Sequence, residues 1–208
     1  MNGARSIVRR DWTRIAIVAV AAIGVWQVAS GTYIHAKAWL AQQLIASAWT
    51  RTLEGEREAK PWPWADTWPI ARLQVIGKSV DLYVLADASG RSLAFGPGYV
   101  NGTAGIGEGN TVLAGHRDTH FAFLQNLQPG DELAMQTADG REWRFQLNET
   151  HVIDSRHERL QFDEAADATL TLLTCYPFDS ITPSGPLRYV AVADIKSGPT
   201  SQPAKERS

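Results

Sequence analysis

The first pattern along the chain is a long, uninterrupted apolar segment near its beginning. The twenty residues from Ile15 to Ile34 contain no side chain that is charged at neutral pH. An α-helix rises about 1.5 Å per residue, so about 20 residues span the roughly 30 Å hydrocarbon core of a bilayer. The pattern therefore predicts a transmembrane helix over residues 15–34, preceded by a short N-terminus, residues 1–14.

Basic residues are concentrated before this apolar segment. Four arginines and one acid, Asp11, precede it, and Lys37 is the nearest charge after it. Short flanks rich in Lys and Arg stay in the cytoplasm. We therefore expect a single-pass protein of the cytoplasmic membrane, with the short N-terminus inside and the main part of the chain on the extracytoplasmic side. The alternative is a cleaved secretory signal, which the small residues Ala29, Ser30 and Gly31 would suit and which exports the main part equally.

Residues 35–69 are expected to form a helical stalk and a connector. In their first part, apolar residues recur at the spacing of one helix face, which fits either an amphipathic helix lying on the next domain or a plain continuation of the membrane helix. Three prolines further on exclude a continuous helix there. Trp62, Trp64 and Trp68 are too apolar for a free linker, so we expect them to pack on the following domain, with membrane-surface contact as the alternative.

From residue 70 the pattern changes to short apolar–polar alternations separated by turn residues. Many short strands at this spacing predict a closed or nearly closed β-barrel. We expect one all-β domain over residues 70–196, with a short helix at Phe121–Leu127, and a disordered tail, residues 197–208. The expected strands are Ala71–Ile76, Val80–Leu85, Thr111–Ala114, Glu132–Gln136, Arg141–Val152, Ala168–Thr174 and Leu187–Ile195.

The composition agrees with one compact domain and limits the classes of partner that the chain is expected to bind. The chain has 208 residues, of which 44% are hydrophobic and 20% charged, proportions that are typical of globular proteins. Its formal net charge of −2 gives no reason to expect nucleic-acid binding. No acidic cluster has the spacing of a calcium loop. We therefore predict neither a metal nor another cofactor.

Cys175 is the only cysteine, so no intramolecular disulfide can hold the fold. Strand alternation places Leu173 and Cys175 on one face, and Leu172 and Thr174 on the other. A strand end holds a side chain rigidly while exposing it to a cleft, which suits a nucleophile. An extracytoplasmic thiol is unusual, because that compartment tends to pair cysteines. This favours a chemical role, and the alternative is a buried structural cysteine.

A cysteine nucleophile reacts as a thiolate, which needs a cationic or hydrogen-bonding neighbour. Among five histidines, His116 stands out because it ends the apolar run Thr111–Gly115, at another strand end. His120, one turn further on, is interpreted as a substrate-groove or packing residue. The other three lie in the helix after the anchor, in a long strand and in a charged loop, where a polar surface or core role explains them better.

Acyl transfer also requires positive charge or hydrogen-bond donors where the tetrahedral oxyanion forms. Arg188 lies at the head of the otherwise apolar strand Leu187–Ala191, which makes it a candidate for this role. The alternative is an arginine at the barrel rim paired with Asp179 or Asp194.

These elements together resemble one protein family. The segment TLLTC at residues 171–175, Arg188 thirteen residues after the cysteine, and Gly115-His116-Arg117 upstream look like a sortase. The resemblance covers residues 70–196. The short loop between Cys175 and Arg188 and the single N-terminal anchor are most similar to the class D sortases and those of Gram-negative bacteria.

The resemblance implies an eight-stranded β-barrel with short helices, and a two-step cysteine transpeptidase reaction. Cys175 would attack the Thr–Gly bond of a Leu-Pro-x-Thr-Gly-like C-terminal sorting signal on a protein substrate, giving a thioacyl enzyme. His116 would protonate the leaving amine, and Arg188 would hold the oxyanion or position the substrate backbone. An amine of unidentified origin, or water, would then resolve the thioester.

The resemblance also implies a binding groove beside the cysteine. Thr174 matches the family position next to the nucleophile and is a candidate oxyanion donor. Leu173, Val190 and residues 94–99 are candidates for an apolar groove that takes an extended peptide, with His120 at its edge.

Two other functions compete with this interpretation. L,D-transpeptidases are also extracytoplasmic cysteine enzymes, but they carry a histidine and a glycine immediately before the cysteine, where this chain has Leu173 and Thr174. A membrane-anchored barrel used for binding or assembly, with Cys175 merely buried, is the non-enzymatic alternative.

Overall fold

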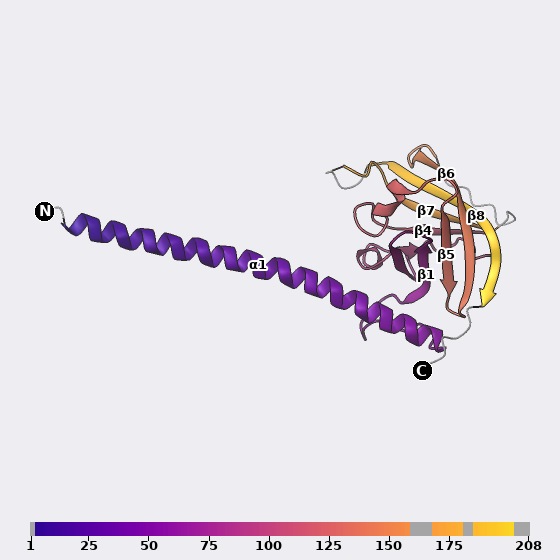
Figure 1. The fold of residues 1–208 in the computed structure, drawn as a ribbon, viewed down its shortest axis with the longest axis horizontal. Helices are drawn as coiled ribbons and strands as arrows, with labels where there is room; N and C mark the ends of the chain where they lie inside the picture. Colours follow the sequence, from indigo (N-terminus) through magenta and orange to yellow (C-terminus); the bar gives the residue numbers. More distant parts are fainter. Residues whose placement is uncertain (1–2, 159–167, 181–184, 202–208) are drawn as a thin grey trace. The chain divides into compact units, whose positions relative to one another are not determined.

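The protein consists of one long helix followed by a β-barrel (Figure 1). The computed structural model describes residues 3–158, 168–180 and 185–201. The chain divides into two compact units, residues 1–42 and 43–208.

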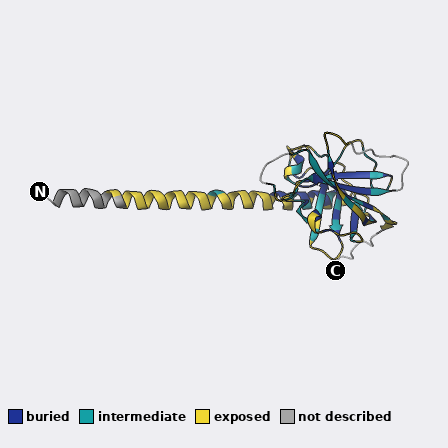
Figure 2. Cartoon of the chain, turned by 90° about the horizontal axis from the view of Figure 1, so that it is seen from above, coloured by how far each residue is buried: buried dark blue, intermediate teal, exposed yellow. Residues whose placement is uncertain are grey.

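The helix α1 runs without interruption from Gly3 to Leu53. Within the described residues it is the one helix long and apolar enough to cross a membrane. Its apolar side chains from Ile15 to Val28 are exposed (Figure 2). Such a continuous exposed apolar surface is unfavourable in water and is suited to a lipid environment.

The last turns of α1 belong to the second unit and pack on the barrel. Ile45, Ala48 and Trp49 are buried, and the Trp49 ring lies 6.3 Å from that of Tyr83. Both interpretations of this segment therefore hold in part, because the helix continues from the apolar segment and its end lies on the domain.

The connector after α1 packs on the barrel through some of its tryptophans. The Trp62 ring contacts Phe95 edge-on at 5.0 Å, and Trp68 is half-buried. The expectation was wrong for Trp64, which is 79% exposed. Of the two neighbours of Trp64, Pro63 is also exposed, whereas Ala65 is buried.

The strands form a closed barrel in the order β1-β2-β3-β4-β7-β8-β6-β5, which confirms the predicted all-β, eight-stranded class. The neighbours β4 and β7 are parallel, whereas β7 and β8 are antiparallel. Two short 3₁₀ helices, η1 (Ser92–Ala94) and η2 (Ala122–Asn126), lie between strands. The strands are β1 (Pro69–Val75), β2 (Val80–Leu85), β3 (Gly98–Tyr99), β4 (Asn110–Ala114), β5 (Glu132–Thr137), β6 (Arg141–Asp154), β7 (Thr169–Cys175) and β8 (Leu187–Ser201).

The sequence pattern missed β3, the two-residue strand that closes the barrel between β2 and β4. Its residues lie in a glycine-dense segment that gives no alternation signal. Gly98 is required there by close approach, because a Cβ atom would lie 2.1 Å from the carbonyl oxygen of Asp87. A glycine in a strand often marks such a close backbone contact.

The strand β8 extends further than the sequence suggested. It continues beyond Ile195 to Ser201 and pairs there with the start of β6, where Thr200 lies opposite Glu142. Backbone pairing with β6 thus orders residues 197–201, which were expected to begin a disordered tail. The remainder of that tail, residues 202–208, lies outside the described residues.

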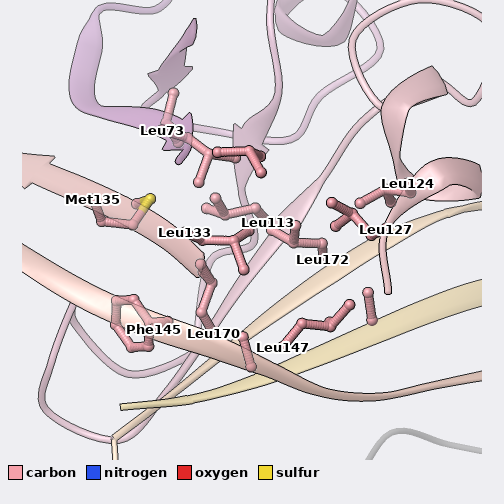
Figure 3. Close-up of a cluster of buried hydrophobic side chains, with 14 of the residues drawn as sticks. Leu73, Leu113, Leu124, Leu127, Leu133, Met135, Phe145, Leu147, Leu170 and Leu172 are labelled. Carbon is pink, nitrogen blue, oxygen red and sulfur yellow. The ribbon is translucent and has the colours of Figure 1, made fainter. Parts of the chain in front are cut away.

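The barrel interior is a single apolar cluster to which most strands contribute (Figure 3). Leu170 and Leu172 of β7 both point into it and are at most 1% exposed, which agrees with the alternation that puts them on one face of this strand. Leu113 of β4 is also fully buried there. Because these side chains alternate with outward-facing ones, the core fixes which face of β7 carries each residue.

We expect Leu172→Ala to lower the free energy of unfolding by about 2–5 kcal/mol, because it removes buried methyl groups and leaves a cavity at the centre of the barrel. Urea unfolding of the full chain in detergent, followed by tryptophan fluorescence, measures this change. Val152→Ala is the control, since Val152 is 42% exposed and should cost under about 0.5 kcal/mol. Equal losses in the two variants would contradict the assignment of Leu172 to the core.

Candidate active site

Cys175 and Arg188 lie directly opposite each other on adjacent strands. Cys175 is the last residue of β7, and its register partner is Arg188, the second residue of β8. The amide of Tyr176 donates to the carbonyl of Leu187 at 3.1 Å, so the neighbouring pair 175/188 is of the non-hydrogen-bonded type. In such pairs the side chains share a face, with Cβ atoms about 4.5–5.5 Å apart.

His116 approaches Cys175 from the other side of β7. The parallel register pairs Ala114 with Leu173, and the amide of Gly115 donates to the carbonyl of Leu173 at 3.1 Å. His116 comes two residues after the end of β4, on the side of β7 where Cys175 ends that strand. Neighbouring strands lie about 4.8 Å apart. The backbone therefore places His116, Cys175 and Arg188 at the same end of the adjacent strands β4, β7 and β8.

None of these three residues is buried in the core. His116 is exposed, and Cys175 and Arg188 are half-buried. A cysteine that served only as a small core residue would be enclosed in the way Leu172 is, at 1% exposure. The thiol thus lies at the boundary between the packed barrel and the solvent, where a reagent can reach it.

Backbone carbonyls hold the Arg188 guanidinium in place. Its Nη1 donates to the carbonyl oxygens of Gly185 at 2.6 Å and Leu187 at 2.9 Å. Within the described residues it forms no ion pair with Asp179 or Asp194, the partners that the alternative interpretation required. Both of these bonds use Nη1, so Nε and Nη2 can donate elsewhere.

Thr174 links the two strands that lead to the cysteine and the histidine. Its side chain is buried, and its hydroxyl Oγ1 donates to the carbonyl of Gly115 at 2.7 Å. A hydroxyl has one hydrogen to donate. In this geometry Thr174 secures the backbone between β4 and β7, and its hydroxyl is not available to an oxyanion.

His120 lies close enough to His116 for their charges to interact. It is half-buried, and its Nδ1 lies 3.5 Å from the Thr119 hydroxyl. Burial lowers the pKa of His120 below its ordinary value of 6.5, the positive charge of His116 lowers it further, and Asp118 opposes this shift. His120 therefore tends to be neutral at neutral pH, which fits a packing or groove role.

The expected groove residues differ in exposure. Leu173 is half-buried and shares the face of Cys175, so a peptide can contact it. Val190 lies opposite Leu173 on the same face, but it is fully buried. Residues 94–99 are largely taken up by the fold, since Phe95 packs on Trp62 and Gly98 lies in β3.

The structure also reveals groups near the cysteine that the sequence analysis did not single out. Tyr176, Phe178 and Tyr189 form an aromatic cluster, in which the Phe178 and Tyr189 rings lie 5.1 Å apart. The signal for it was the pair of aromatics just after Cys175. In addition, Arg117 donates through Nη2 to the carbonyl of Ser180 at 2.8 Å.

The described part of the chain contains no group of three His, Cys, Asp or Glu side chains arranged to hold a metal ion. What the grouped residues offer is a thiol, an imidazole and a guanidinium on one surface. Groups of these types can supply a nucleophile, a proton donor and acceptor, and an oxyanion partner, the set that acyl transfer requires.

Comparison with known proteins agrees with this geometry. Residues 73–196 match the family model of the sortase domain. Sortase D of Bacillus subtilis (strain 168) is 34% identical over 82 residues, which cover 39% of this chain and 40% of that relative. The match thus spans less than half of the relative's length.

Solved structures share the fold. The catalytic domain of SrtD from B. anthracis is 29% identical, with a TM-score of 0.53, and the alignment covers 64% of this chain and 90% of that one. Sortase A of Listeria monocytogenes is 24% identical, with a TM-score of 0.55, covering 64% and 92%. The chain belongs to the sortase family of transpeptidases, and its similarities support an assignment to class D.

Proposed function

We propose that this protein is a membrane-anchored cysteine transpeptidase that cleaves a Leu-Pro-x-Thr-Gly-like C-terminal sorting signal between Thr and Gly. The observation that supports this most strongly is that His116, Cys175 and Arg188 lie at the same end of three neighbouring strands of a sortase domain. Sortase C of Clostridium perfringens, which is 17% identical and shares the fold, has been solved with the C-terminal cell wall sorting motif. A substrate of that class is therefore the natural first choice here.

In the first step, the Cys175 thiolate attacks the threonine carbonyl carbon of the signal. The carbonyl electrons move to oxygen, where the cross-strand guanidinium of Arg188 stabilises the negative charge. Collapse of this intermediate breaks the C–N bond, and imidazolium at His116 gives its proton to the departing glycine amine. The product is a thioester between Cys175 and the shortened substrate.

In the second step, an amine attacks the thioester carbonyl, and His116 accepts the proton that it releases. Arg188 again stabilises the oxyanion. The C–S bond then breaks, which restores the thiolate and leaves the substrate joined to the acceptor by a new amide. Water in place of the amine would give hydrolysis by the same route.

We expect Cys175→Ala and His116→Ala to abolish cleavage of a quenched fluorescent Leu-Pro-x-Thr-Gly peptide. Arg188→Lys should lose at least about a hundredfold in kcat, because a point charge does not reproduce the planar guanidinium. The variants should keep the circular dichroism spectrum and Tm of the parent chain, since none of these side chains is fully buried. Robust cleavage by Cys175→Ala would exclude the mechanism.

The anchoring proposal rests on the exposed apolar part of α1 and on the basic residues before it. It places the catalytic domain on the extracytoplasmic side of the cytoplasmic membrane. The alternative, a cleaved signal, leaves the domain on the same side but not attached.

We expect a membrane-impermeant maleimide to label Cys175 in intact spheroplasts, because the only thiol of the chain then faces outward. The matched control is Ser6→Cys in a Cys175→Ala background, which should be labelled only after lysis. The labelled protein should sediment with membranes after alkaline carbonate extraction. Labelling of the Ser6→Cys control but not of Cys175 in intact spheroplasts would reverse the topology, and release by carbonate would refute the anchor.

A further inference from the structure

Gly115, the residue before His116, is hydrogen-bonded to β7 through both of its backbone groups. Its amide donates to the carbonyl of Leu173 at 3.1 Å, and its carbonyl accepts the Thr174 hydroxyl at 2.7 Å. These two partners directly precede Cys175 in β7. The two bonds therefore hold the backbone next to the histidine against the strand that carries the thiol, through residues adjacent to both.

The ring of Phe121 packs directly on Gly115. A Cβ atom at position 115 would lie 2.7 Å from Cγ and 2.8 Å from Cδ2 of that ring, far inside the distance of about 3.5–4.0 Å at which carbon atoms pack. The φ angle of Gly115 is not positive, so glycine is required here for space and not for backbone conformation. Because the Phe121 side chain is fully buried in the barrel core, its ring cannot swing away from an added methyl group.

Phe121 also holds the other end of the turn that carries His116. Its amide donates to the His116 carbonyl at 2.9 Å, and its ring lies 5.8 Å from that of Phe123. The backbone of His116 is thus fixed on both sides, by Gly115 and by Phe121. We propose that Gly115 is a positioning residue whose missing side chain lets the His116 backbone approach β7, and that the Phe121 ring sets how close this approach is.

The consequence for catalysis follows from the short range of proton transfer. A general acid must lie within about 2.6–3.2 Å of the atom that it protonates, and a misplacement of about 1 Å can cost about a hundredfold in rate. An alanine at position 115 has to move its own backbone, and His116 with it, away from the buried ring. The step that suffers is proton transfer at His116, so this inference rests on the role of that histidine in the proposed acyl transfer.

The test is Gly115→Ala in the full chain in detergent. We expect it to lower kcat for cleavage of a sorting-signal peptide about ten- to a hundredfold, with KM nearly unchanged, at a temperature well below its Tm. The protection of the residue 115 amide from hydrogen exchange, followed by NMR without substrate, should fall, because the bond to Leu173 lengthens. Gly90→Ala is the matched control and should match the parent chain, since a Cβ atom there meets nothing within 4 Å and its φ is likewise not positive.

A double-mutant cycle tests the route through the ring. Phe121→Ala removes the ring, so Gly115→Ala should cause little further loss of kcat in that background. If Phe121→Ala unfolds the barrel, the protection of the residue 115 amide in Gly115→Ala alone decides the question.

Several results would overturn the proposal: parent-like kcat or unchanged protection in Gly115→Ala, an undiminished effect in the Phe121→Ala background, an equal loss in Gly90→Ala, or a loss of kcat that only follows a loss of Tm. If the parent chain cleaves no sorting-signal peptide, the proposed function fails. The protection of the residue 115 amide then still decides whether the Phe121 ring limits the approach of this backbone to β7.

Discussion

The register of three neighbouring strands is the constraint on which the candidate site depends. Parallel pairing of β4 with β7 puts the strand end that leads to His116 beside the end that carries Cys175, and antiparallel pairing of β7 with β8 sets Arg188 opposite the same cysteine. The three residues are far apart in the sequence, and no short-range interaction could gather them. A slip of one residue in either pairing would turn the partner to the other face and separate the thiol from its neighbours.

The barrel core protects this register. Leu170 and Leu172 face the interior from β7, and Leu113 meets them from β4, all at most 1% exposed. A slip would expose these leucines and bury polar groups in their place. The observed register therefore has a lower free energy than either register shifted by one residue. At the rim, the Thr174 hydroxyl adds a side-chain link to Gly115. The stability of the barrel and the geometry of the candidate site therefore depend on the same strands.

Much of this arrangement was predictable from the sequence, because it follows from local patterns. Alternation divided the residues of β7 between two faces, and the strand ends marked Cys175, His116 and Arg188 as candidates. Strand pairing itself leaves no trace in local pattern, so the short β3 and the extension of β8 to Ser201 were missed. Side-chain contacts across the fold, such as the bond from Arg117 to Ser180, could not be predicted for the same reason. The contribution of the family resemblance was to join the three strand ends into one site.

The central claim is that Cys175 forms a covalent bond with the acyl part of a sorting signal. The most direct measurement is intact-protein mass spectrometry after brief incubation of the full chain with a library of sorting-signal peptides and no added amine. The account predicts an added mass equal to a peptide fragment ending at threonine, located on Cys175 by peptide mapping and released by hydroxylamine. No adduct under conditions where the peptide is cleaved, or an adduct on another residue, would contradict it.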